Sequence, residues 1–252
     1  MKIEIGEFLI LSWLRHVRGC VVTQMNWSPS PAWGIARERE LGAAFEALRG
    51  FFAEAAGAPI LGNADVGSFI RDARIDVLGL RLRRPAREVE AIAVDSAIND
   101  SELPHGDAEE TIVRLIQRML RAGFALAGYL NPRQASVVFA TPWLAQPIRE
   151  EVQRRLTRLE ARLAAQRRPA LSDLRFRVIA DADFADEIVQ PVLEHVDAVA
   201  ATSALAGPTD QPARPKAANG AARSDGRRQA KRPSTSGSRK RAPRGATAKA
   251  TV

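Results

Sequence analysis

The 252-residue sequence predicts a layered α/β domain in which helices flank a mixed β-sheet with a central hairpin. Amphipathic helical patterns alternate with short apolar runs, as they do in α/β proteins. Two of these runs, residues 75–82 and 90–95, are separated by a charged loop that contains Pro85, which predicts the hairpin. Residues 1–204 are predicted to form this domain. Residues 205–252 are predicted to be a disordered basic tail, because they lack aromatic residues and apolar periodicity.

The remaining elements are placed by their periodicity and by the signals at their ends. Asp107 provides an N-cap for a long helix that ends at Asn131, and Gly19 provides a C-cap for the first helix. Residues 59–73 carry no firm pattern and have room for one more helical turn. The predicted helices are residues 6–17, 37–56, 107–130, 147–166 and 183–201, and the predicted strands outside the hairpin are residues 20–24, 135–141 and 174–180.

Composition favours a soluble protein of a reducing compartment. With 46% hydrophobic and 26% charged residues, the chain can bury a full core. A single cysteine, Cys20, excludes an intramolecular disulfide and any cysteine-rich zinc site. The N-terminal segment lacks the basic start and small-residue cleavage site of a signal peptide, and no stretch approaches the roughly 18 apolar residues of a membrane span. These features predict a cytoplasmic protein that does not enter a membrane.

The net charge of +8 is divided unevenly along the chain. Residues 206–252 hold twelve of the 37 Lys and Arg residues but only two of the 29 Asp and Glu residues, so the tail carries +10 and the rest −2. A flexible arm of this charge releases counterions when it contacts nucleic-acid phosphates, and DNA is favoured over RNA as the partner. The alternative is a low-complexity extension that only keeps the protein in solution.

Three acidic residues are candidates for a metal site. Asp76 lies near the start of the first hairpin strand and Asp95 near the end of the second, so antiparallel pairing makes them neighbours that can share a divalent cation. Glu7 lies in a helix that is apolar on nearly every face, so its carboxylate should meet a cation or lie at an exposed end. The alternative for the aspartates is structural: Asp76 caps a turn and Asp95 ends a strand.

Several short motifs follow one another along residues 1–141. They are Gly6-Glu7, Trp13-Leu14, Gly19, Asn26-Trp27, Ile75-Asp76-Val77-Leu78-Gly79 and Ala93-Val94-Asp95. Their order and spacing resemble those of the PD-(D/E)XK nuclease superfamily, in particular its small resolvase-like members. The resemblance implies a restriction-endonuclease-like fold and a DNA-binding protein. It also implies that Glu7, Asp76 and Asp95 bind Mg²⁺ or Mn²⁺ and activate water for phosphodiester hydrolysis.

The chain departs from the family pattern where a lysine should follow the second acid. Two residues after Asp95 stands Ala97. In the family this lysine orients the attacking water and stabilises charge on the phosphoryl group. The helix after the hairpin offers Arg114, Arg118 and Arg121 instead, and Arg118 is taken as the candidate catalytic cation. Arginine cannot act as a base at neutral pH, but it can clamp a phosphate with two hydrogen bonds.

Two functions fit these observations. The first is a nucleic-acid-binding, nuclease-like protein, which would be a metal-dependent endonuclease if its degenerate site is active. The second is a catalytically inactive scaffold or interaction protein with a nonspecific nucleic-acid-binding tail. Millimolar Mg²⁺ or Mn²⁺ should raise the melting temperature of the first protein and leave that of the second unchanged. Trp27 and Trp33 are further candidates for contact with nucleic acid.

Overall fold

The computed structural model describes residues 5–56, 61, 64–83, 88–98, 107–166 and 169–205. Contacts along the chain divide it into two units, Met1–Gly207 and Pro208–Val252. All elements of the described ranges belong to the first unit. The predicted disorder of the tail, and the basic clusters within it, lie outside the described residues.

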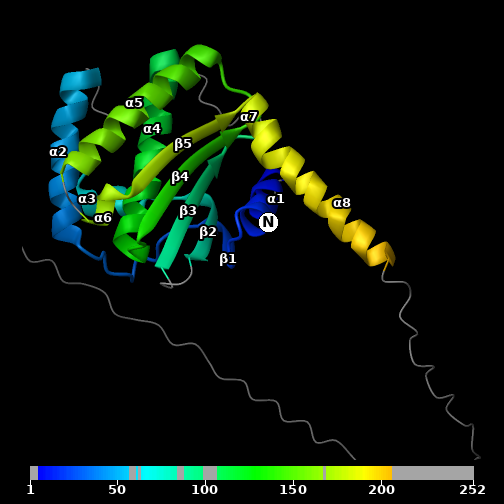
Figure 1. Cartoon of the computed structure of the whole chain (residues 1–252). Helices are drawn as coiled ribbons and strands as arrows, with labels where there is room; N and C mark the ends of the chain where they lie inside the picture. Colours follow the sequence, from blue (N-terminus) through cyan, green and yellow to red (C-terminus); the bar gives the residue numbers. More distant parts are fainter. Residues whose placement is uncertain are drawn as a thin grey trace, which may run out of the picture. The chain divides into compact units, whose positions relative to one another are not determined.

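A five-stranded mixed sheet forms the centre of the first unit (Figure 1). The strands lie in chain order: β1 and β2 are antiparallel, β2 and β3 are antiparallel, and β3, β4 and β5 are parallel. The predicted hairpin is therefore confirmed as β2 and β3, and the strand that precedes it lies at the sheet edge. The bounds are β1 Val22–Trp27, β2 Ile75–Arg83, β3 Glu88–Ser96, β4 Gln134–Thr141 and β5 Leu174–Ala180.

The helices begin and end close to the predicted positions. The first, third and last predicted helices continue through or contain π-helical segments. Asp107 is the N-cap of α4, where its side chain accepts a hydrogen bond from the main-chain N–H of Glu110, and Gly19 follows the first helix at φ 68°. The helical segments are α1 Ile5–Ser12, η1 Trp13–Val17, α2 Glu38–Ala56, α3 Val66–Arg71, α4 Ala108–Ala125, η3 Leu126–Leu130, α5 Gln146–Ala165, α6 Pro169–Ser172, α7 Ala182–Phe184, η4 Ala185–Val189 and α8 Gln190–Leu205.

The segment that the sequence left open, residues 59–73, contains α3. Asp65 caps this short helix by accepting a hydrogen bond of 2.9 Å from the main-chain N–H of Ser68. None of the helices in the described ranges is long and apolar enough to cross a membrane. The cytoplasmic location stays a prediction.

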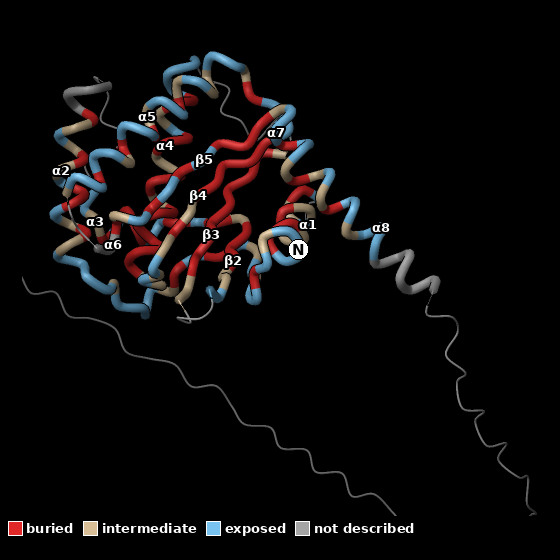
Figure 2. The backbone as a smooth tube through the Cα atoms, viewed as in Figure 1, coloured by how far each residue is buried: buried red, intermediate tan, exposed pale blue. Residues whose placement is uncertain are grey.

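Side chains of the strands alternate between two buried faces, which Figure 2 shows as the red centre of the molecule. On one face Ala91 and Ala93 of β3, with Ala97 just after it, join the larger hydrophobic cluster, together with residues of α2, α3, α4 and α5. On the other face Ile92 and Val94 join a smaller cluster with residues of α1, η1, η4 and α8. Both faces of the sheet are thus packed, which explains why β3 is apolar over most of its length.

One close approach between η1 and the sheet depends on a glycine. A Cβ atom on Gly79 of β2 would lie 2.7 Å from Sγ of Cys20 and 3.2 Å from Cδ2 of Leu14. Cys20 is buried, and burial raises the pKa of its thiol to about 11. The cysteine therefore acts as a small packed side chain against the strand.

Replacing Gly79 by alanine should destabilise the fold by about 1–3 kcal/mol, because the added methyl group overpacks a filled site. Chemical denaturation of Gly79→Ala, Cys20→Ala and the double variant measures this effect. The double variant should lose less free energy of unfolding than the two single losses together, since Cys20→Ala removes the nearest obstructing atom.

Gly50→Ala is the matched control. A Cβ atom at Gly50, inside α2, would meet nothing within 4 Å. Alanine should therefore stabilise the helix there by about 0.5–1 kcal/mol. An equal loss of free energy of unfolding in Gly79→Ala and Gly50→Ala would show that Cys20 does not pack closely on β2.

Candidate functional site

Asp76 and Asp95 lie opposite each other on neighbouring strands. Val77 of β2 pairs with Val94 of β3, so the next position in this antiparallel ladder sets Asp76 beside Asp95. A hydrogen bond joins the two carboxyl groups. Since β3 runs parallel to β4, the pair lies at the carboxyl end of the parallel strands, where open α/β sheets commonly bind ligands.

Arg118 of α4 reaches this carboxyl pair. Its Nη2 atom donates a hydrogen bond to Oδ1 of Asp95 and forms an ion pair with it. The aspartate side chain is 4% exposed and the arginine side chain 40% exposed, so the guanidinium group extends from solvent to a buried carboxyl group. Arg114 instead pairs with Glu110 one turn earlier, and the guanidinium of Arg121 lies over the ring of Phe69.

The pKa of Asp95 depends on burial and on the neighbouring Arg118 and Asp76. Burial raises the pKa of Asp95 to about 8, from its ordinary value of 3.8. The charge of Arg118 acts in the opposite direction, while the charge and hydrogen bond of Asp76 raise the pKa further. Two carboxyl groups this close share a proton readily. A single guanidinium group does not fully compensate for the hydration that the buried carboxyl groups lose.

Asp76 also ties the two hairpin strands together. Its Oδ2 atom accepts hydrogen bonds from the main-chain N–H of Ser96, at 2.7 Å, and from the hydroxyl of Ser96, at 3.2 Å. Ser96 is the last residue of β3. Asp76 thus has a structural contact across the hairpin, different from the turn cap that the sequence suggested, alongside its place in the carboxyl pair.

Glu7 approaches the same end of the sheet from the other face. Its Oε2 atom accepts a hydrogen bond of 3.3 Å from Nδ2 of Asn26. Asn26 falls opposite Asp76 in the register of β1 and β2, between the pairs Met25–Val77 and Trp27–Ile75. The preceding residue, Gly6, lies so close to the chain after β3 that a Cβ atom would be 2.2 Å from Cγ1 of Ile98.

The three acids are thus brought to one end of the sheet, and two of them are in contact. Within the described ranges, no group of three or more His, Cys, Asp or Glu side chains is arranged to hold a metal ion. Binding of a metal by Glu7, Asp76 and Asp95 together stays a prediction.

Ala97, which stands where the family has a lysine, is on the same side of the sheet as Asp95. Ala97 belongs to the same hydrophobic cluster as Ala93, and it is 2% exposed. Its main chain is held on both sides, because its N–H donates to the carbonyl oxygen of Ala140 and its carbonyl oxygen accepts from the hydroxyl of Thr141. A long cationic side chain at this position would have to displace packed atoms.

The structure corrects one prediction for the aromatic residues and adds a histidine contact. Trp27 is 3% exposed and packs against the rings of Trp33 and Tyr129, so it is part of the core and is not available to stack on bases. Trp33 remains 49% exposed. His16 and His195 stack with ring centroids 4.3 Å apart, a contact that no local sequence pattern could reveal.

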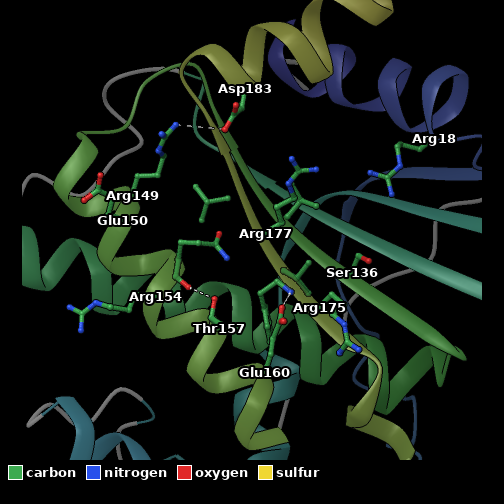
Figure 3. A pocket seen from close by; sticks show the side chains of 15 residues that line it. Arg18, Ser136, Arg149, Glu150, Arg154, Thr157, Glu160, Arg175, Arg177 and Asp183 are labelled. Atoms are coloured by element: carbon green, nitrogen blue, oxygen red, sulfur yellow. Dashed lines mark hydrogen bonds and ion pairs between the residues drawn. The ribbon is translucent and has the colours of Figure 1, made fainter. Parts of the chain in front are cut away.

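A second polar region was also missed by sequence reasoning. It is a hollow lined by several arginines beside β4 and β5 (Figure 3). The available signal was the alternation in β5, where Arg175 and Arg177 flank Phe176. Such alternation indicates one polar strand face, but it does not tell whether another element covers that face.

Comparison with known proteins leaves the resemblance without independent support. No family model, no curated protein and no solved structure matches the chain.

The Asp95 carboxyl group should make stability depend on pH. An unfolded chain loses the Asp95 proton near pH 4, whereas the folded chain keeps it to about pH 8. Between these values the folded state binds more protons, so the free energy of unfolding should fall as the pH rises. Relative to Asp95→Asn, the wild type should lose at least about 1 kcal/mol between pH 4 and pH 8.

Denaturant titrations of the two proteins at several pH values measure this difference. Other titrating groups, including His16, cancel because both proteins contain them. Parallel stability curves for wild type and Asp95→Asn would show that Asp95 does not hold its proton in the folded state.

Proposed function

We propose that the chain is a nucleic-acid-binding protein of the PD-(D/E)XK nuclease-like type, with a restriction-endonuclease-like fold. Arg118 takes the place of the missing lysine in this proposal. The observation that carries it is the contact of Arg118 with Asp95, opposite Asp76, at the carboxyl end of β3. The family motif requires two hairpin acids on one face with a cation beside them, and these three side chains meet that requirement.

The sheet topology supports the same proposal. An antiparallel hairpin is followed by α4 and by a strand parallel to β3, so the acids of β2 and β3 lie where one helix can reach them. Glu7 lies at the same end of the sheet and contacts Asn26 of β1, but it approaches from the other face and is not part of the carboxyl pair.

A divalent metal does not fit the site as it is arranged. Mg²⁺ and Mn²⁺ prefer carboxylate oxygens, which Asp76 and Asp95 offer. However, Oδ1 of Asp95 is bound to Arg118, and Asp76 accepts two hydrogen bonds from Ser96. A metal ion would have to compete with a cation already in place. We therefore derive no reaction step through a metal.

The residues present can still act on a phosphodiester. A guanidinium group stabilises negative charge on phosphate oxygens through paired hydrogen bonds. Asp95, with its pKa raised to about 8, can accept or release a proton near neutral pH, which Arg118 cannot. Arg118 thus supplies charge and position, and the carboxyl pair supplies the group that exchanges a proton.

The alternative is a catalytically silent nucleic-acid-binding protein, and one observation favours it. Each of the two aspartates is engaged by another group of the chain, Asp95 by Arg118 and Asp76 by Ser96. A satisfied carboxyl pair of this kind can be a structural remnant of a nuclease site. Both versions retain nucleic-acid binding, and cleavage distinguishes them.

A cleavage assay with single-stranded, duplex and branched DNA in Mg²⁺ or Mn²⁺ tests the catalytic version. Slow cleavage by the wild type is expected, and Arg118→Ala should reduce it at least about tenfold, since removing one charge-stabilising donor typically has a larger effect still. Arg118→Ala should also increase the rise in melting temperature caused by metal, because it frees an oxygen of Asp95.

Arg114→Ala is the control for this experiment, since Arg114 pairs with Glu110 on the surface of the same helix. It should leave both cleavage and the metal response unchanged. Robust cleavage that survives Arg118→Ala would exclude the assigned role of this arginine. Complete absence of cleavage by the wild type would favour the silent version.

Deleting residues 206–252 should leave the melting temperature nearly unchanged and weaken binding to DNA. Those residues carry a net charge of +10. On duplex DNA, each lost phosphate contact should reduce the slope of log affinity against log salt by about 0.9. Fluorescence anisotropy at several salt concentrations measures the slope. An unchanged slope would assign all binding to the α/β domain.

A further inference from the structure

The arginine-lined hollow is a surface region that the carboxyl pair does not use. It has a volume of about 830 Å³ and lies between α5 and the first halves of β4 and β5, near the end of η1 (Figure 3). Five arginines line it, against three acidic side chains. They are Arg18, Arg149, Arg154, Arg175 and Arg177.

Ion pairs within the chain neutralise only some of these arginines. Arg149 lies 3.6–3.7 Å from carboxylate oxygens of Asp181 and Asp183, and Arg177 pairs with Glu187. In the same way, Arg154 pairs with Glu151. These three guanidinium groups already have acidic partners.

Arg18 and Arg175 have no ion pair with an acid in the part of the chain that the structure describes. Arg18 lies over the ring of Trp13, 5.1 Å from its centroid. Arg175 donates hydrogen bonds of 3.1 Å to the carbonyl oxygens of Ser172 and Leu174. Both guanidinium groups are therefore positioned by neutral groups and keep their charge available to a ligand.

The strand register adds a hydroxyl group to this charge. Arg175 of β5 pairs with Ser136 of β4, so their side chains emerge side by side on one face of the sheet. Arg177 emerges from the same face two residues along, where it pairs with Val138. Arginine guanidinium and serine hydroxyl groups are common donors to nucleic-acid phosphates.

The hollow extends around the edge of β5: Arg175, Arg177 and Ser136 emerge on the sheet face opposite to the carboxyl pair, and residues of α5 line the hollow from the other face. Ile179, which alternates with Arg175 and Arg177, belongs to the cluster of α1 and α8, whereas Asp95 is held from α4. A phosphate held by Arg175 therefore cannot be the one held by Arg118. The ring of Phe176, which also borders the hollow, belongs to the cluster on the other face and is 4% exposed, so it offers no platform for a base.

We propose that this hollow binds the phosphodiester backbone of a nucleic acid, independently of base sequence, through Arg18, Arg175 and Ser136. The choice of polymer rests on the proposed function, while the anionic chemistry rests on the hollow itself. The site is open and uses charge and hydroxyl donors, as expected for contacts that position a strand and do not read its bases. It provides a second anchoring point, away from the carboxyl pair.

The test is DNA binding by the full chain in EDTA, where no metal-dependent hydrolysis occurs. Arg18→Gln/Arg175→Gln should weaken binding to a duplex oligonucleotide by about tenfold and reduce the salt slope by about 0.9 for each lost contact. Arg175→Gln alone should show part of this effect, which matters because Arg18 also packs on Trp13. Melting temperatures should confirm that each variant is folded.

Arg39→Gln/Arg158→Gln is the charge-matched control, because both arginines are exposed and lie outside the hollow. A salt slope for the hollow variants equal to that of this control would overturn the proposal. Chemical modification of arginine by phenylglyoxal, followed by mass spectrometry, gives a second measurement. DNA should protect Arg175 and leave Arg39 reactive.

Inorganic phosphate serves as the competing ligand in the modification experiment. Equal protection of Arg175 by inorganic phosphate and by DNA at the same phosphate concentration would indicate a small-anion site, which overturns the assignment to a polymer. Loss of binding in the hollow variants, combined with no cleavage by the wild type, would support this inference while the catalytic version of the proposed function fails. Cleavage by the wild type, combined with unchanged DNA binding in the hollow variants, would support the catalytic version of the proposed function and overturn this inference.

Discussion

The ion pair between Arg118 and Asp95 is the interaction on which the candidate site depends. Asp95 is 4% exposed at its side chain, and the neighbouring carboxyl group of Asp76 makes its ionisation more difficult still. Without a nearby cation the strand would have to bury two carboxyl groups with only the donors of Ser96 to compensate. The packing of α4 against the sheet therefore determines both the stability of this edge and its electrostatic properties.

The two faces of the sheet carry separate polar regions, one with carboxyl groups and one with arginines. The face toward α4 contains the carboxyl pair, and the face toward α1 and α8 contains Arg175 and Arg177, which are exposed on β5. The free edge of β5 is partly protected, since the side chain of Glu160 from α5 accepts a hydrogen bond from the main-chain N–H of Phe176. This contact leaves the arginines accessible while it blocks strand addition at that position.

Sequence reasoning placed the elements well, because their end signals and periodicity are local. Asp107 begins α4 as predicted, and the hairpin register that sets Asp76 beside Asp95 followed from antiparallel geometry. Arg118 was the predicted cation, but the residues alone did not exclude Arg114 or Arg121. Their spacing places all three on one face of α4, and the position of the helix along its axis decides which one reaches Asp95. Contacts between distant segments were equally out of reach of local patterns.

The absence of a lysine at position 97 changes the physical character of the site, even though Arg118 supplies a positive charge. A lysine on β3 would have extended from the same strand as Asp95, beside the oxygens of that carboxyl group. Arg118 reaches Asp95 from a helix across the cluster and binds one of those oxygens itself. Cation and metal are therefore competitors here, whereas a strand lysine would allow both. In the proposed function a metal would compete with Arg118 for one buried carboxyl group, whose pKa is raised because burial outweighs the charge of Arg118.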